Sequence, residues 1–186
     1  MKKAFYLLLI ILCSSIHIFA QPYSKKNSTQ DEWEQYFKDT TRVLDPIEGI
    51  WSNSNTKKIY NRHYNNLTNT YYFPHYSTIA IYKDGNIYMS YVIGIGDDKP
   101  NFSFKNTASA GNYSAEITYQ ETNSKEKVKA VLTRIDSLAF SFEKPTAQLK
   151  FEYKNKFDDK SIANTLIIYE HQWTKIFPGR QVTDKK

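Results

Sequence analysis

The chain has 186 residues, a formal net charge of +6 and a hydrophobic share of 40%. This length supplies one domain with a full hydrophobic core and is too short for us to expect two. The basic residues are scattered among acidic ones, which disfavours a nucleic-acid binder because such proteins gather their basic residues in a stripe. Fifteen Tyr, eleven Phe and only six Gly favour an all-β fold.

The first 20 residues predict a secretory signal peptide. Lys2 and Lys3 form a basic start, Leu7 to Leu12 form an apolar core, and Ala20 offers a small residue for cleavage. A membrane anchor is the alternative, but the apolar run is too short to cross about 30 Å of hydrocarbon. Cleavage would leave a mature chain that starts at Gln21 with a net charge of +4, because the segment carries two lysines and no acid. We therefore expect a secreted or periplasmic protein with no transmembrane segment after cleavage.

The single cysteine, Cys13, lies inside this segment. The mature chain would therefore hold no cysteine and no disulfide or thiolate chemistry. A lipid-modified cysteine needs a small residue before it, and Leu12 in that place disfavours a lipoprotein.

Residues 21–43 predict a flexible arm followed by a short helix over Gln30 to Lys38, with two acidic residues in its first turn. Trp33, Tyr36 and Phe37 stand at helical spacing and form one aromatic stripe. The simplest role for this helix is a plug packed on the end of the β domain. A helix that binds a partner is the alternative.

From Ile47 onward the hydrophobic period changes to two, which predicts strands. Asp84-Gly85 is a turn pair that predicts a hairpin between two of them. Residues 157–164 are polar and turn-like, and residues 179–186 form a basic tail. The predicted strands are Ile47–Asn53, Ser77–Lys83, Asn86–Ile93, Asn101–Lys105, Ser114–Gln120, Glu126–Arg134, Leu138–Glu143, Ala147–Lys154 and Thr165–Phe177, while Lys57–His63 either pairs as a strand or belongs to a loop.

Apolar and polar residues alternate along several of these strands, which is typical of an antiparallel sheet with one solvated face. Eight to ten strands in meander order favour an up-and-down antiparallel β-barrel over residues 44–178, because closure removes exposed edges. A two-sheet sandwich is the alternative. A filled barrel and a hollow one would use the same inward residues, which we expect to be Ile79, Ile81, Met89, Tyr91, Phe140, Phe142, Leu149 and Phe151.

Gly49-Ile50-Trp51 on the first strand resembles the Gly-x-Trp signature of lipocalins and their calycin relatives. The stretch from Leu44 to Phe177 is similar as a whole to the lipocalin-like domains of secreted bacterial proteins. The resemblance implies that Gly49 and Trp51 close one end of the barrel. It also implies a basic residue over the tryptophan ring, either Lys175 or Arg180. The Thr-Asp-Tyr-like turn of lipocalins is missing from the chain.

The segment from Tyr60 to Tyr76 is rich in aromatic residues and follows the first strand. In lipocalin-like barrels the loop at this place folds over the open mouth, so the resemblance places the segment at the entrance to a cavity. Tyrosine rings with polar tips suit a small, partly apolar molecule or a glycan. A self-packed surface loop is the alternative. The candidate ligand-binding residues are Tyr60, His63, Tyr64, Tyr71, Tyr72, Phe73, His75 and Tyr76.

Patterns for catalysis and metal binding are missing from the sequence. His63, His75 and His171 lack metal-ligand spacing, no Gly-x-Ser-x-Gly elbow occurs, and Gly94-Ile95-Gly96-Asp97 lacks the third glycine of a dinucleotide turn. We therefore expect a non-enzymatic binding protein without cofactor or metal. The alternatives are a cell-envelope or extracellular module that binds a protein or glycan on its surface, and, third, an enzyme without a portable motif.

Overall fold

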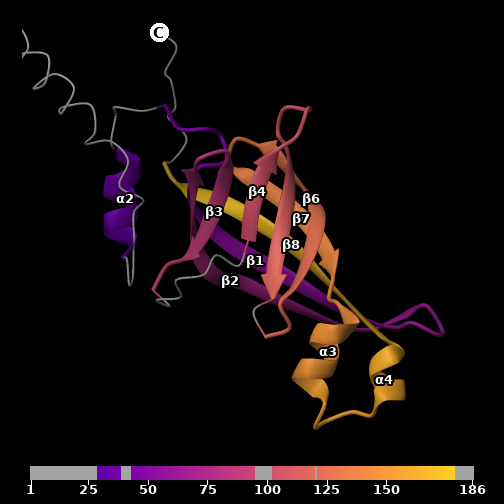
Figure 1. Ribbon diagram of the computed structural model, residues 1–186. Coiled ribbons are helices and arrows are strands. Elements are labelled where there is room, and N and C mark those ends of the chain that lie inside the picture. Colours follow the sequence, from indigo (N-terminus) through magenta and orange to yellow (C-terminus); the bar gives the residue numbers. More distant parts are fainter. Residues whose placement is uncertain (1–28, 39–42, 95–101, 120, 179–186) are drawn as a thin grey trace, which may run out of the picture.

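The computed structural model describes residues 29–38, 43–94, 102–119 and 121–178. Eight antiparallel strands close into a barrel in chain order, and β8 pairs back with β1 (Figure 1). This confirms the predicted all-β up-and-down barrel. The predicted signal peptide and basic tail lie outside the described residues. The strands are β1 (Gly49–Asn61), β2 (Asn66–Asp84), β3 (Ile87–Val92), β4 (Phe102–Asn106), β5 (Asn112–Tyr119), β6 (Ser124–Arg134), β7 (Ser137–Glu143) and β8 (Thr165–Phe177).

Three helices occur in the described part of the chain: α2 (Gln30–Lys38), α3 (Thr146–Tyr153) and α4 (Asp159–Ala163). Each of them is too short to cross a membrane. The β2–β3 and β6–β7 turns lie at one end of the barrel, together with residues 43–48. We call this the closed end. The β5–β6 turn and helices α3 and α4 lie at the other end, which we call the open end (Figure 1).

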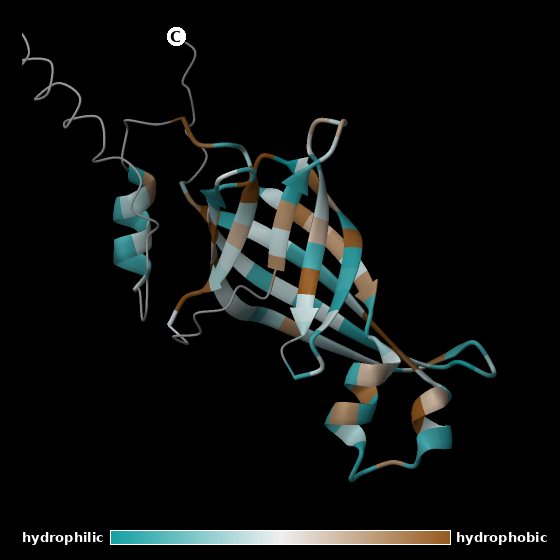
Figure 2. Cartoon of the chain, viewed as in Figure 1, coloured by the Kyte–Doolittle hydropathy of each residue, from teal (hydrophilic) through white to brown (hydrophobic). Residues whose placement is uncertain are grey.

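Large apolar side chains fill the barrel near its closed end. Trp51, Phe104 and Trp173 are fully buried there, because every second residue of a barrel strand points inward. The alternation of hydrophilic and hydrophobic residues along the strands is visible in Figure 2. Four of the expected inward residues take part in this core as predicted: Ile79, Ile81, Phe140 and Phe142.

On β3, the inward residues differ from the expected ones. Tyr91 pairs with Ala80 and Met89 pairs with Tyr82, and residues paired in this way share one face of the sheet. Tyr91 and Ala80 pack together outside the barrel, in a cluster with α2. The prediction that Met89 and Tyr91 point inward is therefore wrong. The inward residues of β3 lie one position away, and a shift of one residue moves every side chain of a strand to the opposite face.

Helix α2 covers the outer wall of the barrel. Trp33 and Phe37 are buried against Ile50, Ala80 and Tyr91, and the rings of Trp33 and Tyr91 lie 5.8 Å apart. The interpretation of this helix as a plug on the barrel end is therefore wrong. The physical reason is that outward positions of β1, β2 and β3 are apolar at this place and need a cover.

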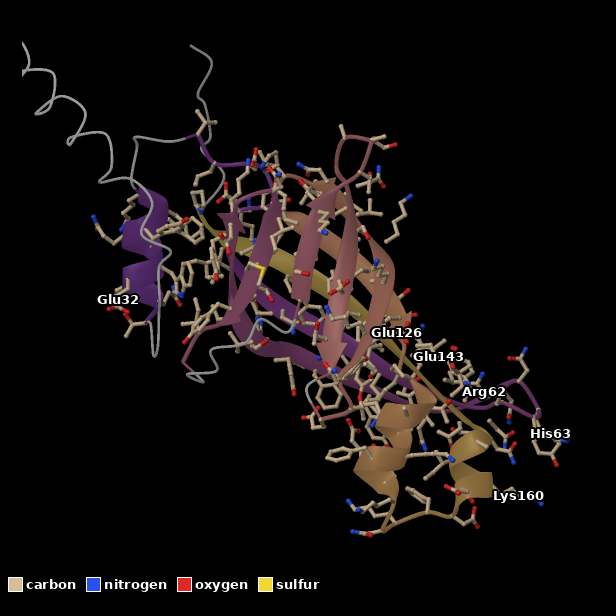
Figure 3. All side chains as sticks on the ribbon, viewed as in Figure 1. Glu32, Arg62, His63, Glu126, Glu143 and Lys160 are labelled. Carbon is tan, nitrogen blue, oxygen red and sulfur yellow. The ribbon has the colours of Figure 1, made fainter. Side chains whose placement is uncertain are left out.

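Beyond the barrel, β1 and β2 continue as a long hairpin. Residues 57–61, for which the sequence allowed either a strand or a loop, belong to β1, and β2 already begins at Asn66. The expected loop over the mouth is therefore replaced by two strands and a short turn, which suits the β-branched and aromatic residues of the segment. Asn65 in this turn has a φ of 49°, which asparagine tolerates. Arg62 and His63 lie at the projecting tip (Figure 3).

A helix, α3, replaces the strand that was predicted over Ala147–Lys154. No strand position is open here, because β7 pairs directly with β8 from Ser137 to Glu143. Leu149 is buried against Ile162 and Ile167, whereas Phe151 is half exposed, so neither side chain belongs to the barrel interior. The turn-like residues 157–164 include the short helix α4, which Asp158 caps by accepting a hydrogen bond from the Ser161 N–H.

At the closed end the chain enters β1 in a tight arrangement. Trp51 is fully buried and its Nε1 donates to the Ile47 carbonyl at 2.9 Å. Lys175 Nζ lies 4.9 Å from the centroid of the Trp51 ring and donates to the Pro46 carbonyl. Burial lowers the pKa of Lys175 to about 8. Arg180, the other basic candidate, lies outside the described residues.

Candidate functional site

A cavity of about 810 Å³ occupies the open half of the barrel. We call it the barrel cavity. Seven strands contribute to its wall, and α3 borders its mouth. The polar residues Asn53, Asn55 and Lys57 follow Trp51 along β1 at every second position, so they point inward like the tryptophan. The same inward face of the barrel is thus apolar at the closed end and polar toward the open end.

Four aromatic rings form a stack along β7 and β8. His171 lies parallel to Phe140 on one side, with ring centroids 4.8 Å apart, and to Phe142 on the other side, at 5.5 Å. Tyr169 continues the stack at 5.6 Å from Phe142. These pairs come from the register of the two strands, which sets Phe140 opposite His171 and Phe142 opposite Tyr169. The barrel cavity therefore has one wall of stacked rings.

His171 is a neutral ring within this stack. It is buried, and burial lowers its pKa to about 4. Its Nδ1 lies 3.1 Å from Asn53 Oδ1 and 3.4 Å from Trp173 Nε1. The shorter contact fits an Nδ1–H that donates to the amide oxygen, and in that tautomer Nδ1 does not accept from the Trp173 N–H. Asn53 in turn donates from Nδ2 to Ser77 Oγ at 3.1 Å. In this tautomer Nε2 of His171 is a hydrogen-bond acceptor.

Two buried polar atoms on the wall of the barrel cavity lack a hydrogen-bond partner among the described residues. They are Asn55 Oδ1 on β1 and the Tyr119 hydroxyl on β5. Asn55 is only 6% exposed. Burial also raises the pKa of Tyr119, so its hydroxyl stays protonated at neutral pH and both donates and accepts. Buried polar atoms are nearly always paired in folded proteins, so two such atoms on residues that line one cavity make its wall a candidate binding site.

Helix α3 forms a fixed rim at the mouth. Gln148 accepts a hydrogen bond from Thr122 Oγ1 at 3.0 Å and donates to Glu152 at 3.1 Å. Glu152 also pairs with Lys144, whose Nζ lies 5.5 Å from the centroid of the Tyr169 ring. These contacts tie the helix to the β5–β6 turn and to β8. Lys144 and Glu152 form an ion pair, and Glu121 at the same rim accepts a hydrogen bond from Gln148 at 3.5 Å.

The structure separates the eight candidate ligand-binding residues into groups. Phe73 and Tyr76 line the barrel cavity. Tyr71 lines a neighbouring groove. His63 and Tyr64 pack on each other near the hairpin tip, and Tyr72 is exposed. Tyr60 lines neither space, and His75 Nδ1 lies 2.8 Å from Ser52 Oγ in an exposed position.

The polar side of the cavity wall was not predicted from the sequence. It includes Asn53, Asn55, Tyr119, Gln148, Tyr169 and His171. The sequence did contain a signal for Asn53 and Asn55, because they follow Trp51 at every second position and therefore lie on the same inward face of the strand. No comparable signal marked Gln148, because that residue reaches the cavity from a helix where a strand was predicted.

In the part of the chain that the structure describes, no group of three or more His, Cys, Asp or Glu side chains could hold a metal ion. Comparisons of the chain with protein-family models, with curated proteins and with solved structures found no match.

Proposed function

We propose that this chain is an exported, non-enzymatic binding protein that holds a small, partly apolar molecule in the barrel cavity. The observation that carries the proposal is the pair of unpartnered buried polar atoms, Asn55 Oδ1 and the Tyr119 hydroxyl, on the wall of one cavity. An unpaired buried polar group costs about 1–3 kcal/mol. A ligand that satisfies both groups would recover this cost when it binds.

The wall of the cavity specifies the chemistry of this ligand. The stack of Phe142, His171 and Tyr169 favours a flat body that can pack on or beside the rings. Asn55 Oδ1 accepts only, so the ligand must present an O–H or N–H donor there. A hydroxylated or amide-bearing aromatic compound fits both conditions, and a sugar ring packed on the aromatic wall fits the second.

The proposal includes the family and the location that the sequence suggests. The position of Lys175 over the ring of Trp51, beside the constrained Gly49, supports a lipocalin-like barrel. The N-terminal apolar segment with its small cleavage residue supports export. We propose a binding role without catalysis because the sequence carries no catalytic motif and His171, the one buried histidine among the described residues, sits in an aromatic stack.

Native mass spectrometry of the mature protein, purified from its own source, tests the proposal first. We expect a bound small molecule that mild denaturation releases in a one-to-one ratio. The released compound is then titrated against Asn55→Leu and Tyr119→Phe, and each variant should bind about three- to tenfold more weakly because one hydrogen bond is lost. Tyr72→Phe, which removes an exposed hydroxyl outside the cavity, is the matched control and should bind as the wild type does.

Two results would overturn the proposal. One is a protein that carries no compound and also ignores a panel of aromatic compounds, sugars and lipids. The other is a bound compound whose affinity is the same in Asn55→Leu, Tyr119→Phe and the wild type, because the ligand would then lie elsewhere.

A second candidate function rests on the outer side of the hairpin. β2 pairs with β3 only from Ile79 to Asp84, so residues 66–77 have a strand neighbour on one side only among the described residues. Leu67, Tyr72 and Tyr76 are exposed along this stretch, and Tyr76 also borders the barrel cavity. A free edge beside exposed aromatic residues suits a partner protein that adds a strand. Helix α2 is less suited, because Trp33 and Phe37 are buried on the barrel.

A lysine in the free edge separates the two functions. We expect Thr70→Lys to abolish capture of a partner protein, because a charged residue on a free edge opposes strand addition. The same variant should leave the affinity of a cavity ligand unchanged. Unchanged partner capture by Thr70→Lys, or no partner at all, would remove the second candidate.

A further inference from the structure

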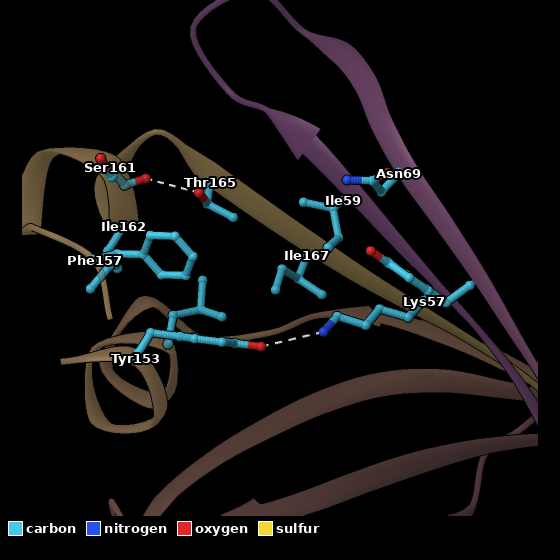
Figure 4. A pocket seen from close by; sticks show the side chains of 11 residues that line it. Lys57, Ile59, Asn69, Tyr153, Phe157, Ser161, Ile162, Thr165 and Ile167 are labelled. Atoms are coloured by element: carbon cyan, nitrogen blue, oxygen red, sulfur yellow. Dashed lines mark hydrogen bonds between the residues drawn. The ribbon is translucent and has the colours of Figure 1, made fainter. Parts of the chain in front are cut away.

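A second space, which we call the groove, lies between helices α3 and α4 and the projecting part of β1, β2 and β8 (Figure 4). Its volume is about 510 Å³. Its floor consists of Ile59 and Ile167, and Leu149 and Ile162 contact these residues from the helices. Phe157 and Tyr71 border the groove with half-exposed rings. The groove is thus an apolar channel that stays open along one side.

Lys57 lies at the place where the groove meets the barrel cavity, because it lines both spaces. Among the described residues that line the groove, it is the only charged one. Its Nζ donates to the Tyr153 hydroxyl at 3.3 Å and lies 6.0 Å from the centre of that ring. No carboxylate in the described chain pairs with it. An ammonium with only a neutral partner at the end of an apolar channel is a site for a negative group.

The neighbouring lysine shows the contrast. Lys58 points to the other face of β1 and forms an ion pair of 2.6 Å with Glu170. Two acids line the barrel cavity together with Lys57: Glu152 is paired with Lys144, and Glu121 accepts a hydrogen bond from Gln148 at 3.5 Å. The ion pair between α3 and α4, Lys150 with Asp159, joins two exposed side chains. Lys57 therefore keeps its charge available to a ligand.

We propose that the groove binds an amphipathic acid, with the acid group on Lys57 Nζ and the Tyr153 hydroxyl and with an aliphatic body along Ile59, Leu149, Ile162 and Ile167. The aliphatic body gains by leaving water, at a rate of roughly 25 cal/mol for each Å² of its own apolar surface that the groove buries. Leu149, Ile162 and Ile167 are already buried in the chain and supply the contact surface. The charge-assisted hydrogen bond to Lys57 selects an acid over a neutral molecule of the same shape. This site is separate from the proposed barrel-cavity ligand and does not depend on it.

Calorimetric titration with two probes of the same chain length, dodecanoate and dodecanol, tests the charge requirement on the full mature chain. We expect the wild type to bind dodecanoate more tightly than dodecanol. Lys57→Gln should weaken dodecanoate about tenfold or more and leave dodecanol unchanged, because one charge-assisted hydrogen bond is lost. Lys57→Arg should retain dodecanoate binding. Lys58→Gln, one residue away on the opposite face, is the matched control and should bind both probes as the wild type does.

Methyl resonances of isoleucine then locate the bound probe. Ile59, Ile162 and Ile167 line the groove, whereas Ile79 and Ile117 line the barrel cavity. We expect dodecanoate to shift the first three and to leave the other two in place. The proposal is overturned by shifts confined to Ile79 and Ile117, which place the acid in the barrel cavity. It is also overturned if Lys57→Gln and Lys58→Gln lose equal affinity, or if neither loses any.

Discussion

At Gly49 the backbone of β1 passes so close to the end of β8 that a side chain has no room. A Cβ atom added there would lie 2.3 Å from the Phe177 carbonyl oxygen, and the φ of Gly49 is +141°. We therefore expect Gly49→Ala to lower the free energy of unfolding by about 3 kcal/mol, from backbone strain and the clash together. Denaturant unfolding of the purified variant measures this loss.

Gly85 is the matched control for this substitution. Its φ is also positive, at +58°, but a Cβ there would meet no atom within 4 Å. Gly85→Ala should therefore cost only about 1 kcal/mol, the strain of the left-handed backbone alone. Equal losses in the two variants would contradict the close approach of β1 and β8 at Gly49.

His171 makes the stability of the fold depend on pH in a defined window. Its pKa is about 4 in the folded chain and about 6.5 in the unfolded chain. Between these values the unfolded state binds a proton that the folded state does not, so stability falls as the pH falls. We expect a loss of about 3 kcal/mol from pH 6.5 to pH 4 and only a small further loss from this group below pH 4.

Unfolding free energies measured across this range, in the wild type and in His171→Gln, isolate the contribution of the histidine. The glutamine variant keeps a side-chain donor for Asn53 and has no titrating group at this position. Its stability should therefore decline less steeply between pH 6.5 and pH 4. Parallel curves for the two proteins would show that His171 is not held neutral by burial.

Among the elements, α3 is the one for which a strand and a helix predict the most different effects of mutation. A strand would place Leu149 and Phe151 on the same buried face, but in the helix Leu149 is 1% exposed and Phe151 is 51% exposed. We expect Leu149→Ala to cost about 2–5 kcal/mol and Phe151→Ala to change stability by less than about 0.5 kcal/mol. Thermal unfolding of both variants checks this, and similar large losses would favour the strand.

The error at α3 has a physical origin in the sequence itself. Residues 147–154 alternate strictly between apolar and polar, which is the strand pattern, yet Leu149 and Tyr153 also stand four apart, as do Gln148 and Glu152. The second spacing allows a helix with one apolar and one polar side. Tertiary context decides between the two, because β7 pairs directly with β8 and leaves no place in the barrel for another strand.

Other elements could be predicted because a local signal and the tertiary structure agree. The turn at Asp84-Gly85 joins β2 to β3 as expected, and the last strand runs over Thr165–Phe177 as predicted. The hairpin of β1 and β2 could not be separated from a loop, because its polar and aromatic residues lack a buried face at the tip. In addition, β1 pairs on its other side with β8, which lies more than a hundred residues away in the chain.

At the scale of the whole molecule, the two halves of the barrel differ in how their interior is packed. The closed half is filled by Trp51, Phe104 and Trp173, whereas the open half keeps a cavity with a polar wall. The sequence could predict half of the expected inward residues, Ile79, Ile81, Phe140 and Phe142, but not which part of the interior stays empty. The position of the cavity depends on which rings stack, such as Phe142 on His171, and on where α3 packs against the barrel. Both are set by contacts between distant strands.

This division predicts opposite effects of one substitution on stability and on binding. Asn55 Oδ1 is buried without a partner in the described chain, which costs the folded protein about 1–3 kcal/mol. Asn55→Leu keeps a similar side-chain shape and removes that oxygen. Without ligand, we expect the free energy of unfolding of Asn55→Leu to be about 1 kcal/mol higher than that of the wild type. We also expect the variant to bind the cavity ligand more weakly.

Denaturant unfolding without ligand and calorimetric titration with ligand measure the two effects on the same protein. If the amide served only to hold the fold, its loss would lower stability, as expected for Asn53→Leu, which breaks the hydrogen bonds to His171 and Ser77. A less stable Asn55→Leu would therefore contradict a role in binding. A gain in stability with a loss of affinity would mean that the barrel tolerates an unpaired oxygen because the ligand needs it.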